Sequence, residues 1–439
     1  MIEPQVGATM TCYLTIRDRY VAMKLRPLIA LLLVNVLLTP NAQALDLGDH
    51  LRIEGFGTLG AFQGDDPVAT VRADPRQKLG SSGNDLRYDA DSLLAIQATV
   101  NPMGPIKGVV QLVTKQDDQG SQKPKFEWAY LGWDINTSIN LKIGRVVAPV
   151  FMTSDMRNVA FAQTMARPMN TVYQLNPITN TDGANFKWQH RIGDNEFGLE
   201  GMIGQSKVAN ITAQYDAKQV LGLGARYTHG PWTVRAGITD LKADVTLATS
   251  VAAKVDALKT SVACTNCASV LNERLVLSNA KARIQTLGVA FDDDTYVFQA
   301  EYATRPGNSI LVPEAAGWYA MAGKRIHTWT PYVMVGHFHI TESDLGLQPA
   351  SSPAAATIQF YNDSFVGLGR GDRTQFGTGL RWDFAPKFAL KVQWDHYRVD
   401  HPTYGTNPAL SFDIPAPPAT ASAFDGKVNS LTVNLDFIF

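Results

Sequence analysis

Residues 427–439, KVNSLTVNLDFIF, end the chain on a strict two-residue alternation. The apolar members of this alternation are Leu431, Val433, Leu435, Phe437 and Phe439. The residues between them are Thr, Asn, Asp and Ile, so three of these four are polar. Successive side chains of a strand point to opposite faces, and a tilted strand of about ten residues crosses a bilayer. This stretch therefore predicts an amphipathic β-strand.

The same alternation recurs along the whole chain. Sixteen such segments begin near residues 51, 92, 106, 125, 140, 183, 195, 218, 231, 281, 295, 315, 328, 372, 386 and 426. Seven tight turns and eight longer connections, including 205–217 and 241–280, separate them in strict order. An up-and-down membrane barrel has short turns at one end and long loops at the other. We therefore predict an all-β fold, a transmembrane up-and-down antiparallel β-barrel of sixteen strands.

A soluble β-sandwich would show the same alternation, but two features favour the barrel. The first is a set of aromatic residues at strand tips, where membrane barrels carry interfacial girdles. They are Phe56, Phe62, Trp133, Trp232, Trp382, Phe384 and Phe439. The second is the opposite face, whose Gly, Thr, Gln and single charges suit a water-filled interior.

Composition excludes several other classes of protein. The 439 residues include 39 Lys and Arg against 40 Asp and Glu, so we expect no nucleic-acid partner. A hydrophobic content of 45% excludes general disorder. Because G-x-S-x-G, H-E-x-x-H and Walker patterns are absent, we expect neither an enzyme nor a cofactor. His337 and His339 would share one strand face and could pair on a metal, but we favour ordinary interior side chains and assign no metal site.

Residues 23–44, MKLRPLIALLLVNVLLTPNAQA, predict a secretory signal. Lys24 and Arg26 precede an apolar run over 27–38, and Ala-Gln-Ala at 42–44 is a cleavage site. A membrane anchor is the alternative, but it needs about 20 apolar residues. We expect translation to start at Met23, residues 1–44 to be removed, and residues 45–439 to form one barrel domain.

The two cysteines beyond this signal, Cys264 and Cys267, lie in the run CTNC inside the long 241–280 connection. In an oxidising compartment this spacing favours a small disulfide over a redox centre or a zinc ligand pair. Helical spacing of Val251, Val255, Leu258 and Val262 suggests a short helix over the barrel mouth. A solvated extracellular loop is the alternative.

With these features the chain resembles the Gram-negative outer-membrane porins of the sixteen-stranded general type. Residues 435–439 are similar to the porin assembly signal, with Phe437 and Phe439 as its aromatic positions. The second likeness is Gly144-Arg145, a strand end that in porins precedes a third loop folded into the barrel. The resemblance implies a constriction loop at about 147–182 and a homotrimer. It also implies contact with outer-membrane lipid and lipopolysaccharide, and assembly by the outer-membrane insertion machinery.

In such a barrel, permeation depends on bore and on interior charge. The candidate constriction residues are Asp155, Arg157 and Arg167 on the loop, and Lys187, Glu200, Arg226, Arg235 and Lys391 on the wall. Four inward acids, Glu301, Asp383, Asp395 and Asp436, are expected nearer the strand ends. Over residues 147–181 the loop has a net charge of +1, whereas general porins usually carry several acids there, which weakens any expectation of cation preference.

These residues predict an outer-membrane channel for passive diffusion of ions and small hydrophilic solutes that leans weakly toward anions. In this hypothesis Arg157 and Arg167 face the narrow section. In the alternative they hydrogen-bond loop carbonyls and hold the loop in place. A substrate-selective channel, for example for small organic acids, shares the same features. A barrel that serves as an adhesin or an enzyme would fill its interior.

Overall fold

The computed structural model describes residues 45–210, 212–341, 345–359, 361, 372–400, 405–407, 412–414 and 424–439. The predicted signal, residues 1–44, lies outside these ranges. Within them, no helix is long and apolar enough to cross a bilayer.

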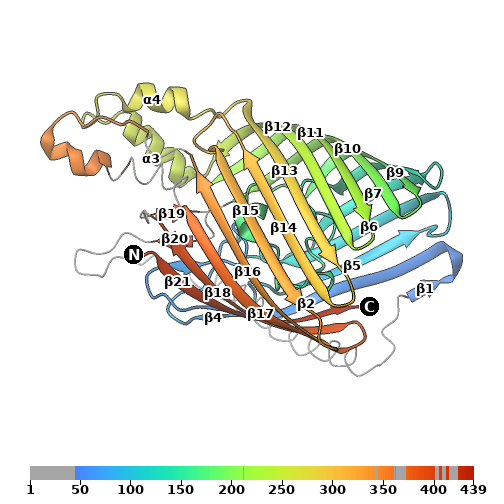
Figure 1. Cartoon of the computed structure of the whole chain (residues 1–439). Coiled ribbons are helices and arrows are strands. Elements are labelled where there is room, and N and C mark those ends of the chain that lie inside the picture. The colour runs from blue at the N-terminus through green and yellow to red at the C-terminus, as the bar shows by residue number, and fades with distance from the viewer. Residues whose placement is uncertain are drawn as a thin grey trace, which may run out of the picture. The chain divides into compact units, whose positions relative to one another are not determined.

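Sixteen long strands dominate the structure (Figure 1). They are β2 (Leu51–Gly64), β5 (Leu93–Val100), β6 (Ile106–Lys115), β7 (Lys125–Asp134), β8 (Ile139–Val147), β9 (Asn180–Ile192), β10 (Asn195–Ala209), β11 (Ala213–His229), β12 (Trp232–Leu247), β13 (Ala280–Asp292), β14 (Tyr296–Arg305), β15 (Ala315–Lys324), β16 (Trp329–Ile340), β17 (Arg373–Ala385), β18 (Phe388–Val399) and β21 (Lys427–Ile438). The short elements are β1 (Leu45–Leu47), β3 (Thr70–Val71), β4 (Leu86–Arg87), β19 (Gly405–Asn407), β20 (Phe412–Ile414), η1 (Gly48–His50), η2 (Ala160–Ala162), η3 (Ser352–Ala354), α2 (Asn170–Tyr173), α3 (Thr249–Lys259) and α4 (Cys267–Arg274).

Each long strand pairs antiparallel with the next long strand along the chain. β2 pairs with both β5 and β21, which closes the sheet into a ring. Closure leaves no open strand edge, as the hydrocarbon of a membrane requires. The predicted all-β, up-and-down barrel of sixteen strands is confirmed, and fifteen of the sixteen predicted strand starts fall within three residues of the observed ones.

The two faces of the sheet differ as the alternation predicted. On β11, Leu221 and Leu223 are exposed on the outer face. On β21, Thr432 and Asp436 are buried on the inner face. Trp133, Trp232 and Phe384 are also exposed, which gives the barrel a large apolar outer surface with aromatic side chains. Such a surface is what lipid covers in a transmembrane barrel.

The prediction was wrong for two of the aromatic tips. The hydroxyl of Thr58 on β2 donates to the carboxylate of Asp436, so the even-numbered residues of β2 face the interior. Phe56 and Phe62 have the same parity, and Phe62 is completely buried. Apolar residues occur on both faces of β2, so the alternation did not distinguish its inner from its outer face.

One predicted long loop is also wrong. The 205–217 stretch belongs almost entirely to two strands, because β10 ends at Ala209 and β11 begins at Ala213. Asn210 Oδ1 accepts hydrogen bonds from the backbone N–H groups of Thr212 and Ala213, the pattern of an Asx turn. Register shifts at 204–206 and 217–219 interrupt the alternation there, which concealed the strand ends.

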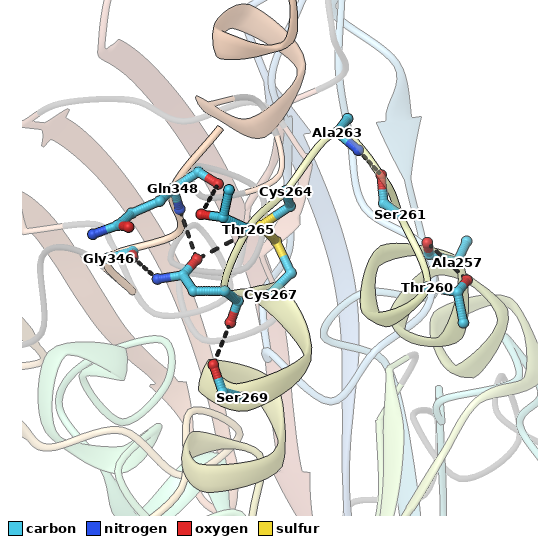
Figure 2. The surroundings of a disulfide bond; sticks show 11 residues. Ala257, Thr260, Ser261, Ala263, Cys264, Thr265, Cys267, Ser269, Gly346 and Gln348 are labelled. Carbon is cyan, nitrogen blue, oxygen red and sulfur yellow. Dashed lines mark hydrogen bonds between the residues drawn. A yellow bond between two sulfur atoms is a disulfide. The ribbon is translucent and has the colours of Figure 1, made fainter. Parts of the chain in front are cut away.

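The 248–279 connection carries two helices beyond the ends of β12 and β13 (Figure 1). Val255 and Leu258 of α3 are buried in an apolar cluster with Leu271 of α4. Val262 lies past the end of α3 and is 95% exposed, so the predicted helical stripe was right only in part. Cys264 and Cys267 form a disulfide between the helices (Figure 2).

The turn around this disulfide contacts a second connection. The backbone N–H of Thr265 donates to Gln348 O at 2.9 Å, and the Asn266 amide donates to Gly346 O at 2.8 Å. The Thr265 hydroxyl also contacts Gln348 O, at 3.3 Å (Figure 2). Leu345 and Leu347 join the same apolar cluster as the helices. The two connections therefore pack into one small cap at the long-loop end of the barrel.

Candidate functional site

Residues 148–179, here called the inner segment, connect β8 to β9 and contact the inner wall of the barrel. Inward-facing side chains of three strands hold its backbone. These contacts are Arg235 Nη1 to Val150 O (2.6 Å), Met152 N to Glu301 Oε2 (2.8 Å), Lys391 Nζ to Ala160 O (2.6 Å) and Lys391 Nζ to Met165 O (3.0 Å). These three groups hold the inner segment along the wall from β12 to β18, and further contacts extend to β11 through Arg226 and to β21 through Thr432.

Glu301 anchors the first half of the inner segment. Its carboxylate accepts from Met152 N–H at 2.8 Å, from the Tyr173 hydroxyl at 2.9 Å and from the Tyr319 hydroxyl at 2.6 Å. Tyr173 itself belongs to the segment, in α2, whereas Tyr319 lies on β15. Glu301 therefore has a positioning role within β14 and does not lie near a strand end as the sequence analysis expected.

Arg167 anchors the second half. Its guanidinium forms a two-pronged ion pair with Asp91, with distances of 2.9 and 2.6 Å, and donates to Thr432 Oγ1 at 2.6 Å. The cation also lies 4.9 Å from the ring centre of Phe62. Only 12% of the Arg167 side chain and 9% of the Asp91 side chain are exposed.

Arg157 is held in a similar way, by a different part of the chain. It lies 3.8 Å from Asp74, donates to Asn176 O at 3.3 Å and stacks over the Tyr173 ring. Asp74 also pairs with Arg76 at 2.6 Å. Burial alone would raise the pKa of Asp74, but the Arg76 and Arg157 guanidinium groups outweigh it and hold that pKa well below its ordinary value.

Two of the predicted wall residues lie behind the inner segment. Lys391 is fully buried and pairs with Asp436 at 2.9 Å, while Arg235 is buried against the carbonyls of Pro149 and Val150. Together with Arg157 and Arg167, they hold the segment in place. Arg157 donates to a carbonyl of the segment, whereas Arg167 contacts Asp91 and Thr432 rather than a loop carbonyl. The carboxylates beside both arginines come from the 65–92 connection.

The remaining predicted residues keep contact with water. Lys187 on β9 lies directly across from Glu200 on β10, and both side chains are partly exposed. Lys142 on β8 interacts electrostatically with both of them and with Asp155, the exposed acid of the inner segment. Arg226 on β11 donates to Met152 O at 3.3 Å. These side chains are partly exposed charges on the inner faces of β8–β11, together with the exposed Asp155 of the inner segment.

The predicted interior position of His337 and His339 is wrong. Phe338 and Ile340, which alternate with them on β16, are buried on the inner face. Phe338 packs there under the Arg373 guanidinium, which lies 6.0 Å from its ring centre. The two histidines therefore lie on the outer face of the barrel.

No protein-family model matches the chain, and no curated protein matches it either. Solved structures do resemble it. OmpF of Salmonella typhi, in complex with daunomycin, has a TM-score of 0.53 at 10% identity, covering 90% of this chain and all of that one. The anion-selective porin of Comamonas acidovorans has a TM-score of 0.50 at 10% identity, covering 89% of this chain and 99% of that one.

The outer-membrane channel DcaP of Acinetobacter baumannii also has a TM-score of 0.50, at 11% identity, and the match covers 90% of this chain and 99% of that one. At such low identity, these likenesses show the fold. The chain has the fold of the sixteen-stranded outer-membrane porins, as the resemblance in the sequence implied.

Proposed function

We propose that the protein is an outer-membrane channel of a Gram-negative bacterium for passive diffusion of ions and small hydrophilic solutes. The observation that carries this proposal is that charged side chains on the inner faces of β8–β11 stay partly exposed. A sixteen-strand ring is too wide for its own side chains to close. The inner segment is fastened along the wall from β12 to β18.

We propose further that the passage leans weakly toward anions. The side chains of Arg157 and Arg167 are only 10% and 12% exposed, and Arg167 is paired with Asp91, so we do not assign this preference to them. The partly exposed charges around the passage supply it instead. Three of these are positive and two negative: Lys142, Lys187, Arg226, Glu200 and Asp155.

Reversal potentials in a KCl gradient test this preference. The reversal potential of the wild-type current should be shifted slightly toward the chloride equilibrium potential. Lys187→Glu should shift the reversal potential toward the potassium equilibrium potential. Lys281→Glu is the matched control, because Lys281 is exposed on the outer face of β13. A clear cation preference of the wild type, or an equal shift in the control, would contradict the charge assignment.

A substrate-selective channel is the second candidate, and one cavity favours it. It lies where the inner segment meets the long-loop ends of β10–β14, and its apolar lining includes Leu175, Val208 and Leu241. Arg305 also lines it and donates to Leu175 O and Pro313 O. Such a lining suits a small organic acid. Liposome flux that saturates with rising acid concentration would favour this candidate, whereas flux proportional to concentration favours general diffusion.

The remaining parts of the proposal concern assembly. We propose export after cleavage at Ala44, insertion by the outer-membrane machinery through Phe437 and Phe439, and a homotrimer in contact with lipopolysaccharide. Short turns would face the periplasm and the 248–279 connection the outside. Phe437 is buried and stacks on Phe388 at 6.3 Å, which ties the proposed signal to the closing strand pair. Mass spectrometry of the envelope protein should give Leu45 as the first residue, and an intact N-terminus would contradict export by this signal.

A further inference from the structure

The two outer-face histidines lie beside a carboxylate at the long-loop end of the barrel. His337 and His339 are on β16, and Asp372 immediately precedes β17. His339 Nδ1 lies 2.8 Å from each carboxylate oxygen of Asp372. One possible ligand atom from each of the three residues can be chosen so that all three lie within 4.8 Å of one another.

The backbone around these residues is fixed by the sheet. His337 pairs with Thr374 across β16 and β17, and the neighbouring pair is Phe338 with Arg373. The ring of His337 is oriented by a 3.1 Å hydrogen bond between Nδ1 and Thr374 Oγ1. A hydrogen bond at one ring nitrogen fixes the direction in which the second ring nitrogen points. Proteins usually position a metal-binding imidazole in this way.

The side chains can reach metal-binding distances without disturbing the core. Zinc bonds of about 2.0–2.1 Å in a tetrahedral site place neighbouring ligand atoms about 3.3 Å apart. The present separation of up to 4.8 Å has to shrink by about 1.5 Å. His339 is 48% exposed and Asp372 35%, so both can rotate about their side-chain bonds.

We propose that His337, His339 and Asp372 form a binding site for a divalent transition metal, with Zn²⁺ as the best match. Two imidazoles and one carboxylate suit zinc, whereas Mg²⁺ and Ca²⁺ prefer oxygen ligands alone. Three protein ligands leave a fourth position open to water. The site is on the outer face and is independent of the proposed passage through the barrel.

Calorimetric titration of the purified, chelator-treated barrel in detergent with ZnCl₂ tests the site. The wild type should bind about one ion per chain. His339→Ala and Asp372→Asn should each weaken binding at least about a hundredfold, since even loss of an outer partner of a metal ligand costs 10–100-fold. His190→Ala is the matched control, because His190 is an exposed strand histidine that stacks on Trp188 and should not affect binding.

A second readout does not depend on heat of binding. Zinc that bridges β16 to the start of β17 should raise the melting temperature of the wild-type barrel, and the chelator EDTA should reverse the rise. Asp372→Asn should melt at a zinc-independent temperature while still running as a folded species on an unheated gel. Wild-type protein without saturable binding, or binding that survives both site variants, would show that His339 and Asp372 form a hydrogen bond only.

Discussion

Replacing Asp91 by Asn should loosen the second half of the inner segment. The change leaves the Arg167 guanidinium buried and without its carboxylate partner. Removing one member of a buried ion pair costs about 3–5 kcal/mol. Because Arg167 keeps the Thr432 hydroxyl and the Phe62 ring, we expect the lower end of this range. A loss of about 3 kcal/mol multiplies the population of the detached segment by about 150.

Hydrogen–deuterium exchange measures this detachment directly. Amides of residues 160–170 should exchange up to about 150-fold faster in Asp91→Asn if they exchange through opening of the segment. Arg191→Gln is the matched control. It removes a pair with Glu196 of similar length, 2.7 Å, in which the arginine is 73% exposed. An exposed pair contributes about 0–1 kcal/mol, so exchange of residues 160–170 should stay near the wild-type rate.

A double variant separates ion pairing from packing. Asp91→Ala combined with Arg167→Met removes both charges and keeps an apolar side chain over Phe62. Since replacing a buried pair by apolar groups is often close to neutral, this variant should exchange more slowly than Asp91→Asn. Unchanged exchange in Asp91→Asn, or faster exchange in the double variant than in Asp91→Asn, would refute the assignment of this pair as the anchor.

Three further variants probe other contacts. Glu301→Ala removes the acceptor of three hydrogen bonds and should destabilise the inner segment by at least about 2 kcal/mol. Single-channel recordings should then show excess current noise. Glu301→Gln should largely return the noise to the wild-type level. Because the folded-state pKa of Asp74 beside Arg76 is well below the ordinary carboxyl pKa of about 4, its ionised form stabilises the fold fully above that pH. This contribution to stability declines progressively as the pH falls from about 4 toward the lowered pKa. The melting temperature should therefore drop below about pH 4, and drop less in Asp74→Asn; equal drops would contradict the pairing. Replacing Cys264 and Cys267 by Ser opens a very short loop, so the loss of folding free energy should be at most about 2 kcal/mol. The effect should be confined to the α3–α4 cap and leave conductance unchanged. A changed conductance would place the cap in the passage.

The barrel could be predicted because alternation is a local consequence of having water on one side and lipid on the other. The alternation correctly predicts the two faces of β21, where Leu431 and Val433 face outward and Thr432 faces inward. It failed for the histidines of β16, because that strand is apolar on both faces: Val333 and Val335 point outward, and Phe338 points inward. A pattern with two apolar faces does not indicate which one is inside.

The site could be predicted only in part, for a different reason. Facing pairs such as Lys187 and Glu200 follow from strand register. The partners of Arg157 and Arg167 did not follow, because Asp74 and Asp91 come from a separate connection, and Asp91 is 76 residues from Arg167. Which carboxylate neutralises a loop cation depends on how two irregular segments pack, and no local pattern in the sequence records that.

Single-channel recording of the purified barrel in a planar lipid bilayer tests the central claim most directly. A barrel whose inner segment covers one side of the wall should insert in discrete steps. Each step should carry a current linear in voltage that rises in proportion to salt concentration, as expected for a water-filled passage. Folded, inserted protein that carries no ionic current would contradict the account, since its interior would then be closed.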